Sequence, residues 1–115
     1  GLARCYGVEW PERSRGYALK GAQGFLVGAA WPGEYAGLLE VLARARAAED
    51  QASLSRARRA DTGSPSLFVA PDGRVLARRE EEGLLVAEPD WGFLEAYRKK
   101  YPLLRHRREE LYRLW

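Results

Sequence analysis

The sequence contains few of the residues on which several classes of protein depend. Its 115 residues include one cysteine, Cys5, and one histidine, His106. These two residues are too few for an internal disulfide framework or a structural zinc site. No apolar run approaches the roughly 20 residues that cross a bilayer, and no signal-peptide pattern opens the chain. We therefore expect a cytoplasmic protein without membrane contact and without a metal site.

Three residue types are missing altogether, namely methionine, isoleucine and asparagine, and arginine far outnumbers lysine. This bias indicates a GC-rich genome and a thermophilic host, in which labile residues are often reduced. Because methionine is absent, the sequence either has lost its initiator before Gly1 or begins inside a longer reading frame.

Neither sign of charge dominates, since 19 basic residues oppose 16 acidic ones and give a net charge of +3. The basic run at 105–108 is followed at once by Glu109 and Glu110, and no aromatic residue interleaves it for base stacking. We therefore expect no nucleic-acid partner. Residues 102–115 are instead predicted to form a tail that packs at a subunit interface or lies in solvent.

With 46% of its residues hydrophobic, a chain of this length predicts one folded domain over 1–115. Strand-like and helix-like segments alternate, which indicates an α/β fold that opens with a parallel crossover. Strands are expected at 1–5, 23–30, 52–59, 66–70, 74–78 and 83–88, and helices at 11–20, 35–51 and 91–101. The segment 52–59 reads as a half-exposed strand, but it could also be helical because alanine and arginine both favour helices.

Capping and turn residues mark the ends of several of these segments. Pro11 suits the first turn of a helix, Gly21 can end that helix in a left-handed conformation, and Asp90 can cap the helix at 91–101. The sequence Pro-Asp-Gly at 71–73 predicts the turn of a hairpin.

Five motifs follow one another along the chain. They are GLARCYGVEWPE at 1–12, ALKGA at 18–22 with AAWP at 29–32, LARARAAEDQ at 42–51, SLFVAPDGRVLA at 66–77 and PLLRHRREELY at 102–112. In this order they resemble the nitrilase superfamily of carbon-nitrogen hydrolases over essentially the whole chain. Asp50 stands where that family usually has asparagine.

The resemblance implies a particular fold and a particular catalytic group. The fold would be the C-terminal half of a four-layer αββα sandwich, with a mixed sheet, helices on one face, and the other face covered by a partner or a second copy. The family catalyses with a Glu-Lys-Cys triad and no cofactor, and Cys5 falls on its nucleophile. The glutamate and the lysine precede the cysteine in the family, so neither can be assigned here, and Lys20 matches a different, helix-end lysine.

A thiolate at Cys5 would attack the carbon of a small amide or nitrile and form a thioester, which water then hydrolyses. Because both catalytic partners are missing, the isolated chain is predicted to be inactive. An N-terminal-half partner would have to supply them. Arg4, Gly7 and Glu9 depart from the family's pattern around the nucleophile, which hints at relaxed selection on the site.

Further residues are candidates for the substrate site. Tyr6 adjoins the nucleophile, while Ala30 and Trp31 end the strand at 23–30, and ligands lie at such carboxyl ends. All three are predicted to contact substrate, although packing explains Trp31 equally well. Glu12 is predicted either to contact the residues of the site without touching the substrate, or to be a negative charge at the start of the helix.

A non-catalytic alternative remains open at this point. A lone cysteine in a small apolar strand is most often a core residue. The chain could therefore be a truncated relative that has lost catalysis and serves as a structural or interaction module. Since a half-sandwich exposes one sheet face, two copies could pack sheet to sheet as a homodimer.

Overall fold

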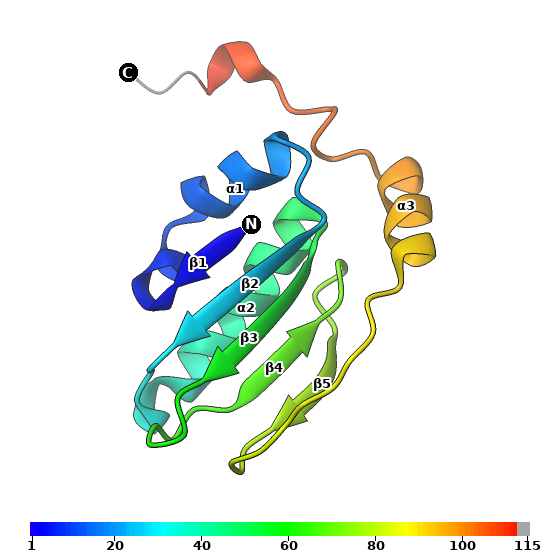
Figure 1. Cartoon of the computed structure of the whole chain (residues 1–115). Coiled ribbons are helices and arrows are strands. Elements are labelled where there is room, and N and C mark those ends of the chain that lie inside the picture. The colour runs from blue at the N-terminus through cyan, green and yellow to red at the C-terminus, as the bar shows by residue number, and fades with distance from the viewer. Residues whose placement is uncertain (113–115) are drawn as a thin grey trace.

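The computed structural model describes residues 1–112. In this part of the chain, five strands form a single sheet and three α-helices pack around it (Figure 1). The strands are β1 (Leu2–Arg4), β2 (Gly24–Ala29), β3 (Ser53–Arg58), β4 (Ser66–Val69) and β5 (Val75–Arg79). The helices are α1 (Pro11–Leu19), α2 (Ala36–Asp50) and α3 (Trp91–Lys100), with short 3₁₀ turns η1 (Cys5–Glu9), η2 (Gly33–Tyr35) and η3 (Glu109–Leu111).

The sheet is mixed, and its strands lie in chain order from β1 to β5. The first three strands are parallel, while β4 pairs antiparallel with both β3 and β5. The register places Leu2 beside Leu26 and Leu26 beside Ser55. The predicted α/β fold with a mixed sheet is therefore confirmed, and so is the strand interpretation of 52–59.

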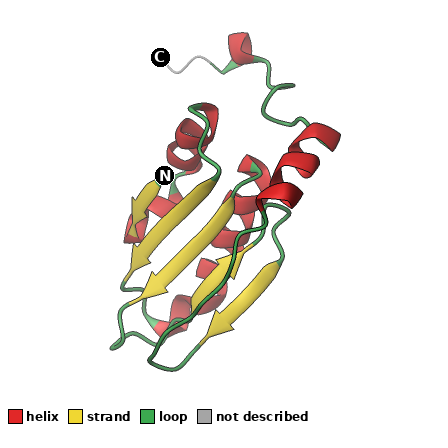
Figure 2. Ribbon diagram, turned by 45° about the vertical axis from the view of Figure 1, so that its right-hand side comes forward, coloured by secondary structure: helices red, strands yellow, loops and turns green. Residues whose placement is uncertain are grey.

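One face of the sheet carries the core. Alternate residues of β2 point to this face and are buried, as are Leu54 of β3 and Leu67 of β4. They pack against small residues of the helices, among them Ala43 and Ala47 of α2. Figure 2 shows α2 running behind the sheet. The predicted placement of helices on one face is confirmed for α1 and α2, which supply the helical residues of this core.

The opposite face is largely uncovered. Leu26, between two buried neighbours in β2, is 61% exposed, and Leu2 beside it is exposed as well. The segment 80–90 leaves β5 and passes in front of this face on its way to α3 (Figure 2). Its residues Leu84 and Leu85 share a groove with Ser55 and Ser66 of the sheet.

The strand predicted at 83–88 does not form. The segment crosses the sheet face instead of lying along an edge, so its backbone has no neighbouring strand to bond with in residues 1–112. Its inward side chains Leu85 and Ala87 are half-buried, whereas Leu84 and Val86 are exposed. The same alternation is visible in the sequence, where it predicts a strand.

The local signals at the helix ends are borne out. Pro11 is the first residue of α1, and Gly21 after it adopts a left-handed φ of 93°. The Asp90 side chain accepts a hydrogen bond from the backbone N–H of Phe93 at 2.8 Å, which caps α3. Within residues 1–112, no helix is long and apolar enough to cross a membrane.

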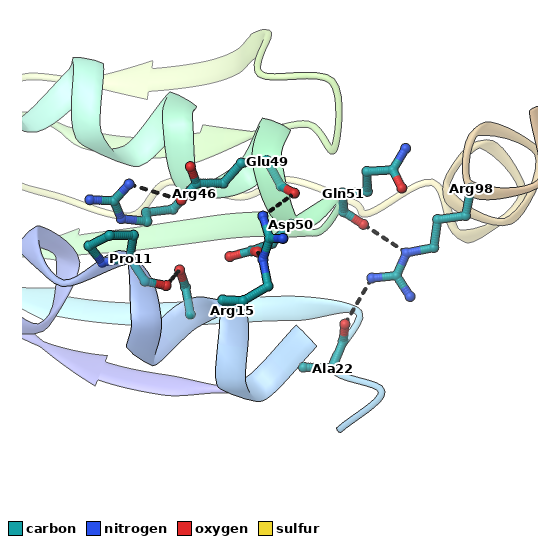
Figure 3. Close-up of polar contacts among 9 residues, drawn as sticks. Pro11, Arg15, Ala22, Arg46, Glu49, Asp50, Gln51 and Arg98 are labelled. Atoms are coloured by element: carbon teal, nitrogen blue, oxygen red, sulfur yellow. Dashed lines mark hydrogen bonds and ion pairs between the residues drawn. The ribbon is translucent and has the colours of Figure 1, made fainter. Parts of the chain in front are cut away.

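Helix α3 sits at the amino ends of β2 and β3. Its Arg98 donates from Nε to the carbonyl of Gln51 and from Nη2 to that of Ala22, both at 2.9 Å (Figure 3). The same guanidinium is partly buried, which lowers the pKa of Arg98, while the charge of Asp50 acts to raise it.

Candidate active site

Cys5 lies where the first parallel strand ends. β1 stops at Arg4, and Cys5 begins the 3₁₀ turn η1 with a φ of 34°. A non-glycine residue rarely adopts positive φ, and backbone strain of this kind clusters at functional sites. Since β1 and β2 are parallel, Cys5 and the residues after Ala29 emerge at the same edge of the sheet.

A cavity of about 400 Å³ opens beside Cys5. Its walls come from η1, from the loop after β2, from η2 and from the start of α2: they are Cys5, Tyr6, Glu9, Ala30, Trp31, Pro32, Tyr35 and Leu38. A volume of this order suits a small organic ligand. The structure thus brings the predicted residues Cys5, Tyr6, Ala30 and Trp31 together in one cavity.

Trp31 plays two structural parts. It is buried in a cluster with Val8 and Leu39, and it also forms part of the cavity wall. The cluster ties the loop after β2 to the inner side of α2, so both interpretations of Trp31 from sequence have a counterpart in the structure.

Four residues of the cavity were not among the candidates from sequence. Glu9 adds a carboxylate, and Pro32, Tyr35 and Leu38 complete the wall. Tyr35 and Leu38 follow the helical apolar spacing of α2, which predicts core positions, but both are half exposed. Their closeness along the chain to the AAWP motif is the signal that could have found them.

The turn that carries Cys5 is held from below by Arg46 of α2. Arg46 is buried and donates from Nε to the carbonyl of Val8 at 2.9 Å and from Nη2 to that of Glu9 at 3.2 Å. Its Nη1 pairs with Glu49 at 2.9 Å (Figure 3). A buried cation on the helix therefore fixes the backbone on which the thiol sits.

A second polar contact joins α1 to the end of α2. Arg15 pairs through Nε with Asp50 at 2.5 Å and donates from Nη2 to the carbonyl of Glu49 at 2.8 Å (Figure 3). Asp50 is completely buried. The departure from asparagine at this position is accounted for by the ion pair, because the carboxylate balances the arginine.

Arg56 of β3 is a functional candidate that the sequence did not reveal. It is 1% exposed, and burial lowers its pKa to about 10, while the charge of Cys5 acts in the opposite direction. Its guanidinium donates to the carbonyls of Ala29 and Pro65 and to Oγ of Ser64. The sequence predicts a half-exposed strand at 52–59. The predicted exposure is wrong at Arg56, because acceptors from other segments bond its guanidinium inside the protein.

Glu12 lies outside this cavity. It is exposed in the first turn of α1 and lines a separate groove with Arg15 and with His106 and Arg107 of the tail. The tail residues 102–112 thus pack near α1, and residues 113–115 of the predicted interface segment lie outside the described residues. Across residues 1–112, no group of three or more His, Cys, Asp or Glu side chains could hold a metal ion.

The sequence profile described as carbon-nitrogen hydrolase matches residues 1–99. The chain belongs to the carbon-nitrogen hydrolase family. Among its curated relatives is the chloroplastic omega-amidase of Arabidopsis thaliana, 38% identical over 127 residues, which cover 99% of this chain and 33% of that protein. The deaminated glutathione amidase of Homo sapiens is 38% identical over 123 residues, covering 97% of this chain and 37% of that protein.

Solved carbon-nitrogen hydrolases share the fold. Saccharomyces cerevisiae Nit3, a member of branch 10 of the nitrilase superfamily, superposes with a TM-score of 0.87 at 29% identity, over 94% of this chain and 43% of Nit3. An amidase mutant from Nesterenkonia, in complex with butyramide, superposes with a TM-score of 0.81 at 33% identity, over 99% of this chain and 42% of that chain. In a related structure, of a mutant of that amidase, the acetamide moiety of fluoroacetamide has added covalently at the active site cysteine.

This chain spans between 33% and 37% of the two curated relatives named above. It therefore corresponds to a part of a carbon-nitrogen hydrolase domain. This agrees with the half-sandwich that the motif order predicts.

Proposed function

We propose that this chain carries the nucleophile of an amidase, and that Cys5 attacks the carbonyl carbon of a small amide. The observation that carries the proposal is the cavity of about 400 Å³ in which Cys5 meets Tyr6, Ala30 and Trp31. The amidase names of the curated relatives favour an amide over a nitrile as the substrate. In the Nesterenkonia amidase the active site cysteine carries the acetamide moiety of fluoroacetamide, which supports a nucleophilic cysteine at this position of the family.

The reaction has two steps at Cys5. The thiolate forms a bond to the amide carbon, the C–N bond breaks, and ammonia leaves after taking up a proton, so that a thioester remains on the sulfur. Water then attacks the thioester, the C–S bond breaks, and the carboxylic acid departs with the thiol restored. The net reaction consumes one amide and one water and yields one acid and one ammonia.

Residues beyond this chain complete the site in our proposal. The family resemblance implies a glutamate base and a lysine that stabilises the oxyanion, and preorganised donors of that kind contribute about 3–4 kcal/mol each. The uncovered sheet face, with Leu2 and Leu26, is where the rest of a full-length hydrolase would pack. A second copy of this chain on that face is the alternative, and it would make the chain a homodimeric module instead of an enzyme.

The test begins with the intact mass of the native polypeptide in its source cells. We expect a polypeptide far heavier than 13.0 kDa that releases ammonia from short aliphatic amides such as butyramide. Cys5→Ala should abolish that release, and Val41→Ala, at an exposed position of α2, serves as the matched control. Ammonia release that survives Cys5→Ala would overturn the proposal, and a native 13.0 kDa homodimer would favour the module.

A further inference from the structure

Arg56 is a buried cation that has no role in the reaction proposed above. Its side chain enters the helix-covered side of the sheet from β3 and is 1% exposed. Among residues 1–112, no carboxylate pairs with its guanidinium, and its Nε has no acceptor. Buried charges are normally paired, so the missing counter-ion calls for an explanation.

Hydrogen bonds hold this guanidinium against the wall of the Cys5 cavity. Nη2 of Arg56 donates to Oγ of Ser64 at 2.6 Å and to the carbonyl of Ala29 at 3.4 Å. Oγ of Ser64 in turn donates to the carbonyl of Trp31 at 2.6 Å, and Nη1 of Arg56 donates to the carbonyl of Pro65. The cation is thereby fixed behind the end of β2, next to the residues that face the thiol.

The sheet brings Arg56 and Cys5 to the same place: Arg4 of β1 pairs with Gly28 of β2, so Cys5 follows beside Ala29, whose carbonyl accepts a hydrogen bond from Arg56. Burial is the largest influence on the Arg56 guanidinium and lowers its pKa to about 10, and the charge of Cys5 is the next largest and opposes it. An opposite charge nearby favours the charged form of an ionisable group. Cysteine thiolates next to arginine are the reactive form of the residue.

We propose that Arg56, oriented by Ser64, is the buried counter-ion of the Cys5 thiolate and keeps the nucleophile partly activated within this chain. The proposal deepens the function proposed above, because it assigns a positioning residue to the same thiol. Arg56 would act through Cys5 without touching the substrate.

Other charged groups surround the thiol and must be weighed with Arg56. Glu9, Tyr6 and Tyr35 line the same cavity, and the carboxylate of Glu9 disfavours a thiolate. On the positive side, Arg4 precedes Cys5, and Arg58 follows on β3, where it donates to the carbonyl of Thr62 at 3.1 Å. Further cations contact η1: Arg13 approaches Gly7, and Arg46 donates to the carbonyls of Val8 and Glu9.

The experiment measures iodoacetamide alkylation of Cys5 in the 115-residue chain as a function of pH, with intact mass as the readout. Cys5 is the only cysteine in the sequence, so the rate reports a single thiol. The variants are Arg56→Gln, Arg56→Lys and Ser64→Ala. Arg98→Gln is the matched control, because Arg98 is also a partly buried arginine bonded to carbonyls, but at the opposite end of the strands.

We expect Arg56→Gln to slow alkylation at neutral pH by about tenfold, because an adjacent opposite charge commonly shifts a titration by one unit or more. The rate at alkaline pH, where every variant is a thiolate, should stay unchanged. Arg56→Lys should restore most of the neutral-pH rate, Ser64→Ala should give a smaller loss, and Arg98→Gln none. Glu9→Gln should change the neutral-pH rate in the opposite direction to Arg56→Gln.

A purely structural role for Arg56 predicts a different result. In that case Arg56→Gln would change the alkylation rate at alkaline pH as well as at neutral pH. Arg56→Lys would not restore the pH midpoint of alkylation. Unchanged midpoints in both Arg56→Gln and Ser64→Ala would overturn the proposal. If circular dichroism shows that Arg56→Gln does not fold, Ser64→Ala, which removes one hydroxyl, decides by the same criterion.

This test is independent of amide hydrolysis. An Arg56-dependent midpoint together with no amidase activity in the longer polypeptide would sustain the counter-ion and end the proposed function. Suppose instead that ammonia release depends on Cys5, but that the pH midpoint of alkylation is the same in the Arg56 and Ser64 variants as in the parent. The proposed function would then stand and the counter-ion proposal would fail.

Discussion

The two faces of the sheet are made by the same strands and differ in what covers them. In β2, Val27 is buried against the core cluster that α2 completes, while the adjacent Leu26 is 61% exposed on the other side. On that side the segment 80–90 crosses only part of the sheet, and its own Leu84 is exposed. An exposed apolar face of this kind marks an interaction surface. The comparison teaches that this chain completes one packed interface and leaves a second apolar face open.

The sharpest way to break this comparison is a pair of leucine truncations. Leu54→Ala, on the covered face, should lower the free energy of unfolding by about 2–5 kcal/mol, since it removes buried volume. Leu26→Ala, on the open face, should change it by less than about 0.5 kcal/mol. Urea unfolding of the 115-residue chain, followed by circular dichroism, measures both. Equal losses would mean that the open face is buried in solution.

The polar contact within the covered layer gives the next largest effect. Asp50→Asn should cost about 1–3 kcal/mol, because Arg15 then loses its carboxylate partner in a buried setting. The control is Asp61→Asn. The side-chain hydrogen bond from Arg59 holds the pKa of Asp61 below its usual value, but this pair is exposed to solvent, so no measurable loss is expected. A harmless Asp50→Asn would show that the ion pair does not fasten α1 to α2.

Arg56 predicts a smaller, pH-dependent effect in the covered layer. Because burial lowers its pKa to about 10, the folded protein releases this proton at lower pH than the unfolded chain does. The free energy of unfolding should therefore rise above pH 10, by at most about 1.4 kcal/mol per pH unit. The rise should be absent from Arg56→Gln. That variant keeps all the other groups that titrate at alkaline pH, so the difference between the two proteins reports Arg56 alone. Parallel curves for the two proteins would contradict the lowered pKa.

The smallest effect on the fold is expected from a charge on the open face. Leu26→Lys should alter the free energy of unfolding by less than about 0.5 kcal/mol, because the side chain stays in solvent. It should nevertheless weaken any association of the chain through that face. Sedimentation of the 115-residue chain, at concentrations well above those of the unfolding experiments, compares the two, and there we expect the parent to associate and the variant to be monomeric. A monomeric parent would show that this face does not bind a second copy.

Elements with local signals are predictable from this sequence, and those that depend on distant partners are not. The cap at Asp90 and the hairpin around 71–73 rest on residues within a few positions of one another, and both form. The segment 83–88 has the alternation of a strand, but no strand of the described residues 1–112 pairs with it. Periodicity records which side chains face inward and says nothing of whether a backbone partner exists.

The candidate site shows the same division. Cys5, Tyr6, Ala30 and Trp31 follow from the order of motifs, and they line one cavity. Arg56 could not be recognised, because its burial depends on Ser64 and Pro65, which the chain reaches only after leaving β3. An arginine in an alternating strand reads as solvent-facing unless the acceptors around it are known.

The central claim is that Cys5 is the nucleophile of an amidase that the rest of the protein completes. Its most direct test is to mix the longer polypeptide with butyramide, quench in acid and determine the mass of the peptide that contains Cys5. The account predicts an added butyryl group on that peptide in the parent and none in Cys5→Ala, which should also release no ammonia. Hydrolysis of the amide without an adduct, and undiminished in Cys5→Ala, would contradict it.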